Sequence, residues 1–557
     1  MPTRNAMWDR LGGDVDLLVV GGGITGAGIA RDAIRRGLSV ALVEQRDLAY
    51  GTSSRSSKLV HGGLRYLEQY EFSLVFEAVS ERRILLDIAP HIVNPLGFLF
   101  PIYEGSSHGM GTIAAGMWLY EGLSLFRSPK RHRRLKPADL AREEPPLTQE
   151  GLKGAPLYYD CSTDDARLTL ETALDAAEQG ATIATWARVE SFLRDEGGRI
   201  VGARVRDTLG EEVREVRARA VVSATGPWCD DLRQLDHPET RPLLRPTKGI
   251  HLVVAREVLP IQHAVVCFHP VDDRVLFAIP WGDRTYVGTT DTDYEGPPED
   301  VAADADDVDY LIEAAGRYFP DHRIQREDII STWAGLRPLI SGDTQEGIDE
   351  SMVSREHQIV VDPSGLITIA GGKLTTYRRM AAEVVDAAVN LMRVTGKLPE
   401  TLVAAQTDEV PLPGAVGWPE DDDHERVSRQ VLAASGGYLD SVTSRLLADT
   451  YGMRGRQVAQ RIKADPSLAS PLVEGRPEVM AQVDFAVEEE LAATVEDVLV
   501  RRTQLFFRDR DQGLGAAEAV AGRMGQLLGW SAEERQTRIE AYRAVVALSR
   551  RWREEPA

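Results

Sequence analysis

The stretch DLLVVGGGITGAGIARDAIRRGLSVALVE, residues 16–44, decides the fold of this chain. Its apolar run 16–20 predicts a short buried strand, and 21–26 reads as a glycine-rich turn. Apolar residues then recur at helical spacing from Ile24 to Ile34, and Gly37 stands where a helix would end. The apolar run 39–43 predicts a second strand. A strand, a helix and a second strand in this order indicate an α/β fold with a parallel sheet.

The turn carries a nucleotide-binding pattern. Gly21, Gly23 and Gly26 spell GxGxxG, in which the glycines permit a tight turn, close approach to a pyrophosphate and close helix packing. The helix N-terminus offers free N–H groups to phosphates. Glu44 lies 18 residues beyond Gly26, where a carboxylate bonds ribose hydroxyls. The segment therefore predicts a dinucleotide site, with an ordinary strand–helix turn as the alternative.

The motif does not separate NAD from FAD. A second glycine pair, Gly371 and Gly372, precedes a predicted helix whose positive end could face a reduced, anionic flavin. Another strand–helix connection would look the same.

Composition narrows the class of protein. The chain has 557 residues, enough for two or three domains, with 43% hydrophobic and 27% charged residues. Its formal net charge of −22 argues against nucleic acid as a partner. An anionic substrate would need a local cluster of cations.

Targeting signals and metal motifs are not found in the sequence. The three cysteines are far apart, so we expect neither a disulfide framework nor a metal site. The N-terminus lacks the apolar run of a signal peptide, and no stretch reaches the roughly 18–20 apolar residues of a membrane span. We expect a cytoplasmic protein.

Two later segments are each typical of a strand that enters a glycine turn, namely 219–228 and 365–378. In 282–355 short strands alternate with charged and aromatic residues, as expected for the cover of a pocket. A proline-rich, acidic stretch around 405–425 predicts a linker. Beyond it, 443–452, 488–502 and 533–551 show helical periodicity, so we expect a separate helical domain.

Several ordered motifs carry a family resemblance. They are the segment 19–44 together with GTSSRSSKLVHGGLRYLE (51–68), YYDCSTDDARL (158–168), ATGPW (224–228), KGIHLVV (248–254), RVLFAIPWGDRTYVGTTD (274–291), AGLRPL (334–339) and GGKLTTYR (371–378). Over about 15–395 the chain resembles the FAD-dependent, aerobic respiratory glycerol-3-phosphate dehydrogenase family. The tail, with TVEDVLVRR (494–502), resembles the family more loosely.

The resemblance implies a discontinuous architecture. It predicts a Rossmann-like FAD-binding domain (14–100, 155–240 and 345–400), interleaved with a β-sheet substrate domain of the D-amino-acid and glycine oxidase type (101–154 and 241–344). A linker (401–425) and an all-helical C-terminal domain (426–557) would follow. The implied FAD-binding residues are Gly21, Gly23, Ile24, Gly26, Glu44, Ser53, Ser54, Ser57, Lys58, Thr225, Gly226, Gly371, Gly372, Lys373, Leu374 and Thr375.

The implied reaction oxidises sn-glycerol 3-phosphate to dihydroxyacetone phosphate, with hydride passing from C2 to flavin N5. A phosphate dianion calls for charge-assisted donors, preferably arginines. The matched segments supply Arg65, Arg274, Arg337, Arg355 and Lys373, with Tyr66 as a donor to a substrate hydroxyl or a packing residue.

The hydroxyl proton needs a base with a pKa near the working pH, which favours histidine. By resemblance His251 ranks ahead of His61, although His61 could position the flavin and either could be a core histidine. Arg337 or Lys373 could stabilise the developing alkoxide.

The resemblance also implies a membrane quinone as electron acceptor and a peripheral position on the inner face of the cell membrane. The best contact is 108–136, where an apolar stretch precedes the cations Arg127, Lys130, Arg131, Arg133, Arg134 and Lys136. A buried helix followed by a solvated loop is the alternative there. Other readings are a soluble oxidase that uses oxygen, a flavoenzyme for an amine or 2-hydroxy acid, and a non-catalytic flavin-binding scaffold. A homodimer is possible.

Overall fold

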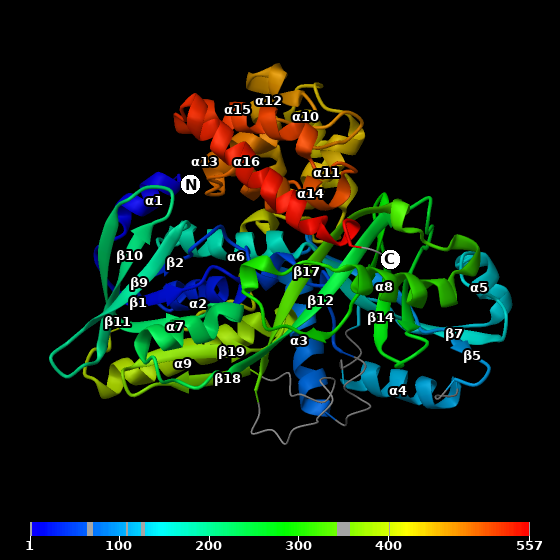
Figure 1. Ribbon diagram of the computed structural model, residues 1–557, viewed down its shortest axis with the longest axis horizontal. Helices are drawn as coiled ribbons and strands as arrows, with labels where there is room; N and C mark the ends of the chain where they lie inside the picture. The colour runs from blue at the N-terminus through cyan, green and yellow to red at the C-terminus, as the bar shows by residue number, and fades with distance from the viewer. Residues whose placement is uncertain are drawn as a thin grey trace.

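The computed structural model describes residues 3–63, 71–106, 110–123, 128–341, 357–399 and 401–555. In these ranges the chain forms two sheets that lie side by side and a cluster of C-terminal helices above them (Figure 1). Within the same ranges, no helix is both long and apolar enough to cross a membrane.

The first sheet is built around β1 (Asp14–Val20), which pairs in parallel with β2 (Val40–Val43) and β11 (Val213–Ser223). Its strand order is β18-β19-β11-β1-β2-β8, and β10 and β9 extend it antiparallel from β11. The remaining strands are β8 (Thr182–Ala184), β9 (Ala187–Arg194), β10 (Ile200–Asp207), β18 (His357–Val361) and β19 (Leu366–Gly371).

Both faces of this sheet are covered, which explains why the buried half of β1, from Leu17 to Val20, is apolar. Successive side chains of a strand point to opposite faces. Leu17 and Val19 are fully buried against the helix layer, whereas Leu18 and Val20 pack toward β10 and α7 (Cys229–Asp236). The helix layer consists of α2 (Ile24–Arg35), α6 (Asp165–Glu178) and α9 (Tyr377–Val394). The expected βαβ unit and the α/β fold are confirmed.

The second sheet has the order β16-β12-β15-β14-β13-β4-β7-β3, with β17 paired to β12 and the short β5 and β6 paired to β7. Its long antiparallel pair, β12 and β17, crosses the middle of the molecule (Figure 1). The strands are β3 (Leu59–Val60), β4 (Val93–Leu99), β5 (Ile102–Tyr103), β6 (Arg133–Leu135), β7 (Leu152–Thr163), β12 (Leu244–Ala255), β13 (Ala264–Phe268), β14 (Val275–Trp281), β15 (Arg284–Gly288), β16 (Thr292–Asp293) and β17 (Ile329–Ile340).

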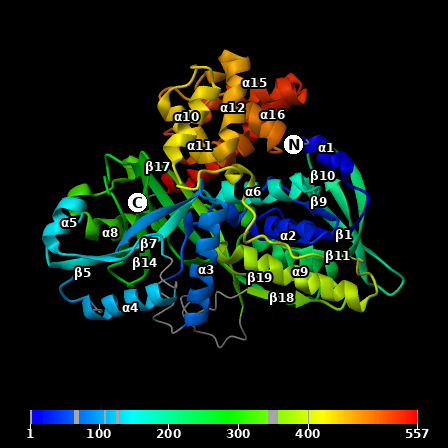
Figure 2. The same cartoon turned by 180° about the vertical axis from the view of Figure 1, so that it is seen from behind.

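Helices cover both faces of the second sheet as well. On one face lie α5 (Pro137–Glu143) and α8 (Ala305–Tyr318), and on the other lie α3 (Phe72–Ile88) and α4 (Met110–Leu123). Figures 1 and 2 both place α3 and α4 at the lower edge of the molecule. The expected division 14–100 and 155–240 assigned β4 and most of β7 to the cofactor domain. Both strands belong to the second sheet, because the whole of β4 pairs with residues 157–163 of β7.

The C-terminal part is helical, as expected. Its helices are α10 (His424–Ala434), α11 (Ser441–Tyr451), α12 (Gly455–Ala464), α13 (Ala481–Glu489), α14 (Leu505–Arg508), α15 (Ala517–Leu528) and α16 (Ala532–Ser549). The continuous helix expected over 488–502 is wrong. The helix α13 ends at Glu489, and Leu491 has a φ of 62°, which a helix does not allow. Next to this break the buried Glu490 pairs with Arg167. A π-helical turn follows at Asp497–Arg502. The helix α1 (Arg4–Arg10) packs beside β8.

Candidate active site

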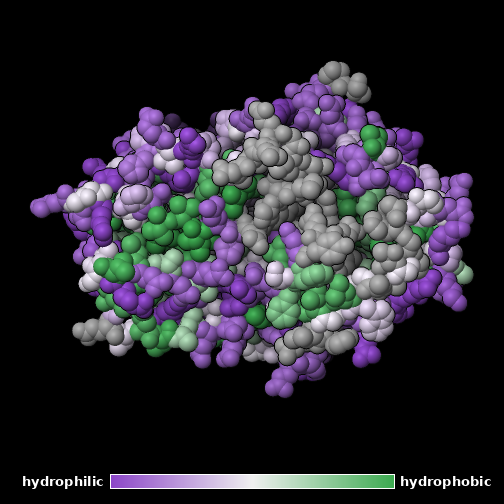
Figure 3. Space-filling model, turned by 90° about the horizontal axis from the view of Figure 1, so that it is seen from below, coloured by the Kyte–Doolittle hydropathy of each residue, from purple (hydrophilic) through white to green (hydrophobic). Residues whose placement is uncertain are grey.

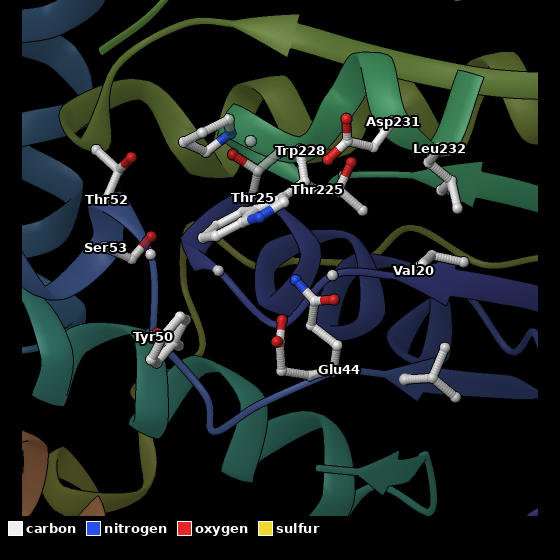
Figure 4. Close-up of a pocket in the computed structure, with 18 of the residues that line it drawn as sticks. Val20, Thr25, Glu44, Tyr50, Thr52, Ser53, Thr225, Trp228, Asp231 and Leu232 are labelled. Carbon is white, nitrogen blue, oxygen red and sulfur yellow. The ribbon is translucent and has the colours of Figure 1, made fainter. Parts of the chain in front are cut away.

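A cavity of about 770 Å³ opens at the carboxyl edge of the first sheet. Ligands of open α/β sheets bind at this edge, where the strand order reverses. Figure 4 shows Val20 and Glu44 at the ends of β1 and β2, with Tyr50 on the same side and Thr225 and Trp228 across from them. The cavity extends to Pro338 of β17 and to Lys373, so it reaches the second sheet.

The nucleotide turn is packed too tightly for any side chain. Gly21 has a φ of 112°, and a Cβ there would lie 2.5 Å from the carbonyl oxygen of Ala224. A Cβ on Gly26 would lie 1.9 Å from the carbonyl oxygen of Gly21. The helix α2 begins at once, with Gly23 as its N-cap, and therefore directs its N–H groups and its positive end toward the cavity.

Glu44 holds the turn from the end of β2. Its carboxylate accepts hydrogen bonds from the backbone N–H of Gly22 at 2.6 Å and of Arg46 at 2.8 Å. Burial raises the pKa of Glu44 above its ordinary value, although these two donors lower it. The glycine cradle, the helix N-terminus and a carboxylate facing the cavity are the parts that a dinucleotide requires, so the residues present fit FAD.

Most of the predicted cofactor residues line this cavity. They are Gly21, Gly23, Ile24, Glu44, Ser53, Thr225, Gly226, Gly371, Gly372, Lys373 and Leu374. Gly26, Ser54, Ser57, Lys58 and Thr375, all of which the structure describes, are not among the lining residues. Tyr50 and Trp228, whose ring centroids are 6.2 Å apart, line the cavity and were not predicted, although Trp228 lies in the quoted segment ATGPW.

Lys58 lies in a buried ion pair. Its side chain is buried, and the ammonium lies 2.6 Å from the carboxylate of Asp165 at the start of α6. The same ammonium sits over the rings of Trp333 and Phe507. These contacts join the Lys58 loop to α6 and to the second sheet, and the flavin contact that the resemblance implies stays a prediction.

His251 lies on β12, opposite Trp333 of β17. The two rings stack with centroids 4.6 Å apart, and the Nε2 atom of His251 lies 2.9 Å from the hydroxyl of Ser57. Burial, followed by the charges of Arg337 and Lys58, lowers the pKa of His251 well below its ordinary value. The imidazole is therefore neutral at physiological pH, and its lowered pKa makes it a weaker base than an ordinary histidine.

Arg337 and Arg274, two of the predicted phosphate ligands, converge on Asp291. Arg337 donates to the Asp291 carboxylate at 2.9 Å and to the Thr289 hydroxyl at 3.0 Å. Arg274 donates to the backbone carbonyl of Asp291, and its guanidinium lies 3.9 Å from the carboxylate. Asp291 was not singled out, although it ends the quoted segment 274–291. Its charge holds both guanidiniums in one place.

The other predicted residues are only partly placed. His61 meets Thr375 through its backbone, since its N–H donates to the Thr375 hydroxyl at 3.2 Å and its carbonyl accepts from the same hydroxyl at 3.3 Å. Arg65, Tyr66 and Arg355 lie outside the described residues. Within the described part of the chain, no group of three or more His, Cys, Asp or Glu could hold a metal ion.

Comparison with known proteins agrees with this geometry. Residues 16–378 match the family model described as FAD dependent oxidoreductase, and 405–535 match the C-terminal domain of alpha-glycerophosphate oxidase. The aerobic glycerol-3-phosphate dehydrogenase of Bacillus subtilis (strain 168) is 38% identical over 529 residues, which cover 94% of this chain and 93% of that protein. The protein of the same name from Staphylococcus epidermidis (strain ATCC 12228) is 37% identical over 545 residues, covering 98% and 96%.

Solved structures give the same result. The glycerol-3-phosphate dehydrogenase from Bacillus halodurans complexed with FAD superposes with a TM-score of 0.79 at 34% identity, covering 98% of this chain and 97% of that chain. Glycine oxidase from Geobacillus kaustophilus, at 21% identity and a TM-score of 0.50 over 70% of this chain and 96% of that one, shares the fold alone. The chain belongs to the aerobic, FAD-dependent glycerol-3-phosphate dehydrogenase family, and its cofactor is FAD.

Proposed function

We propose that this protein oxidises sn-glycerol 3-phosphate to dihydroxyacetone phosphate at the point where the cofactor cavity meets β17. The observation that carries the proposal is the reach of that cavity. It is continuous from the nucleotide turn to Lys373 and to Pro338, the neighbour of Arg337. Lys373 thus lines this cavity, and Arg337 directly precedes Pro338 in β17, the strand that reaches the cavity through Pro338.

The charged residues would hold the phosphate. Arg337 and Arg274 are already oriented by Asp291, so little further ordering is required when an anion binds. Lys373 lines the cavity itself and would add a further positive charge. Arg65, Arg355 and Tyr66 complete the predicted set. In a protein with a net charge of −22, such a local cluster is what attracts an anionic substrate.

In this proposal a histidine removes the proton of the C2 hydroxyl. His251 is neutral and buried, and its Nε2 already has a hydroxyl partner in Ser57. Its neutral imidazole keeps one acceptor nitrogen, which would take the proton of the C2 hydroxyl. Because its lowered pKa makes it a weak base, nearby cations would have to lower the pKa of that hydroxyl. His61 is the second candidate. Bound FAD would accept the hydride from C2, and Arg337 or Lys373 would stabilise the developing negative charge on oxygen.

An anaerobic titration of the holoenzyme tests the substrate. We expect sn-glycerol 3-phosphate to bleach the flavin absorbance, whereas glycerol, which lacks the phosphate, and glycine, an amine substrate, leave it unchanged. Bleaching by glycine alone would replace the proposal with an amine oxidase. A flavin that no substrate reduces would favour the non-catalytic scaffold.

For the electron acceptor we propose a membrane quinone, reached from the lower face of the molecule. On α3 and α4 this face exposes Phe72, Phe76, Trp118 and Leu119, at 40%, 44%, 61% and 43% respectively. Figure 3 looks onto the lower face and shows hydrophobic residues exposed among hydrophilic ones. The cations Lys130, Arg131, Arg133, Arg134 and Lys136 are exposed close to the end of α4, and Arg127 lies outside the described residues. An apolar surface beside cations suits an anionic membrane interface on the inner face of the cell membrane.

Vesicles of anionic lipid test this surface. Changing Lys130, Arg131 and Arg134 together to Gln should weaken vesicle binding by about two orders of magnitude, at roughly 1 kcal/mol for each cation. The matched control changes Arg429, Arg456 and Lys463, which are exposed on the C-terminal helices, and should bind as wild type. Equal binding by both variants would leave α4 as an ordinary surface helix.

The oxidase alternative is tested by reoxidation. After anaerobic bleaching, recovery that is fast with a quinone analogue and slow in air supports the dehydrogenase. Fast recovery in air with hydrogen peroxide formed would identify an oxidase.

A further inference from the structure

The segment 44–53, which connects β2 to the short helix Thr52–Ser54, clamps the nucleotide turn at three points. The Glu44 carboxylate accepts from the N–H of Gly22 at 2.6 Å, and the Ala49 N–H donates to the Gly22 carbonyl at 3.0 Å. The Ser53 hydroxyl accepts from the N–H of Ile24 at 2.9 Å, at the first turn of α2. The shape of the GxGxxG turn therefore depends on where this segment lies.

This segment is itself anchored from the C-terminal domain. Asp47 is fully buried, and its carboxylate lies 2.5 Å from Nε of Arg501 and 2.5 Å and 2.9 Å from the two terminal nitrogens of Arg502. Both arginines close the π-helical turn Asp497–Arg502, some 450 residues away in the sequence. Arg501 also lies over the ring of Tyr50, with its guanidinium carbon 5.7 Å from the centroid, and Tyr50 lines the cavity.

The charges of Asp47, Arg501 and Arg502 are paired with one another. Burial alone would raise the pKa of Asp47, but Arg502 and Arg501 outweigh it and hold the pKa below its ordinary value. Arg502 also donates to the carbonyl of Glu490 at 2.7 Å, and Arg501 donates to Asp497 at 2.8 Å. A buried charge that loses its partner is strongly destabilising, so neither side of the contact can move away independently.

Trp186 makes a second link between the π-helical turn and the 44–53 segment. The indole N–H of Trp186 donates to the Asp497 carboxylate at 3.3 Å, and the backbone N–H of Trp186 donates to the carbonyl of Arg46 at 2.8 Å. The turn thus contacts the 44–53 segment directly through Asp47 and Tyr50, and indirectly through Trp186.

We propose that Asp47, Arg501 and Arg502 are positioning residues for FAD, through which the C-terminal helical domain holds the 44–53 segment against the nucleotide turn. The C-terminal helical domain would then influence the affinity for FAD, although none of its described residues lines the cavity. Such coupling is reciprocal, so bound FAD must strengthen the docking of the π-helical turn by the same factor. The inference concerns the cofactor alone and is independent of which substrate is oxidised.

The test measures the dissociation constant of FAD from the holoenzyme, by the rise in flavin fluorescence on release, together with the melting temperature. Arg502→Met should raise the dissociation constant about 5- to 150-fold, the usual range of coupling between two sites. Arg502→Lys keeps the charge but loses the paired geometry and should recover part of the affinity.

Arg523→Met is the matched control. The Arg523 side chain donates to Asp484 and Gln526, which both lie in the described part of the C-terminal domain and do not line the cavity. The control should lower the melting temperature while leaving the FAD dissociation constant as in wild type. Should Arg502→Met not fold, Asp47→Asn removes the same charge pair from the cofactor side with little change in shape, and the same rise is expected. An unchanged dissociation constant in these variants, or an equal rise in Arg523→Met, would overturn the proposal.

Discussion

The two ends of the FAD cavity are built in different ways. The nucleotide turn, the start of α2 and Glu44 come from one continuous stretch, 20–53, and 187–190 and 224–235 complete the lining there. The other end is lined by Pro338 of β17 and by the turn after β19, which come from distant parts of the chain. In the proposal, the first end holds a group common to many enzymes, and the second lies beside the substrate. Changes at the two ends should therefore separate cofactor binding from catalysis.

The largest effect is expected at the nucleotide end. Gly26→Ala places a Cβ 1.9 Å from the carbonyl oxygen of Gly21, so the turn and α2 cannot keep their present approach. The purified variant should contain no FAD, as measured by its flavin absorbance. Gly13→Ala, whose added Cβ meets nothing within 4 Å, is the control and should carry FAD normally. A Gly26→Ala protein with a full complement of flavin would show that the cradle is not required.

A smaller, selective effect is expected at the other end. Gly288→Ala places a Cβ 2.1 Å from Cδ2 of His251, so the imidazole must shift. A misplacement of this size costs about 100-fold in rate, and we expect that loss in kcat while FAD stays bound. Gly522→Ala on α15, whose Cβ meets nothing within 4 Å, should leave kcat unchanged. Normal turnover by Gly288→Ala would remove His251 from the reaction.

The smallest effect is one of pH. Because the folded pKa of His251 lies well below its ordinary value, its contribution to stability is complete above about pH 6.5 and is lost as the pH falls below it. Below pH 6.5 the free energy of unfolding should fall by up to about 1.4 kcal/mol more per pH unit in wild type than in His251→Asn. Urea unfolding between about pH 5 and 7.5 measures the difference. Parallel curves for the two proteins would mean that folding leaves the pKa of His251 at its ordinary value.

The same contrast explains what could be predicted from the sequence. Gly26 contacts Gly21 and Glu44 contacts Gly22, within one short stretch of chain, so the spacing of these residues predicted their place. The resemblance placed Arg337 and His251 in the second sheet, but only the structure shows Asp291 joining two arginines and Ser57 meeting His251.

Long-range ion pairs could not be predicted from the sequence. Lys58 pairs with the buried Asp165, and the helix expected over 488–502 breaks where Glu490 pairs with Arg167. Arg501 and Arg502 read as polar residues of an amphipathic helix, yet both are buried against Asp47. Each of these ion pairs joins residues more than 100 positions apart, and local periodicity carries no information about such partners.

The most direct test of the account is an anaerobic titration of Arg337→Ala holoenzyme with sn-glycerol 3-phosphate. Arg337 belongs to the second sheet, and the nucleotide turn does not depend on it. The account predicts that this variant retains FAD with the wild-type dissociation constant and that its flavin is not bleached by substrate. Bleaching at the wild-type rate, or loss of FAD from the variant, would contradict the separation of the two ends.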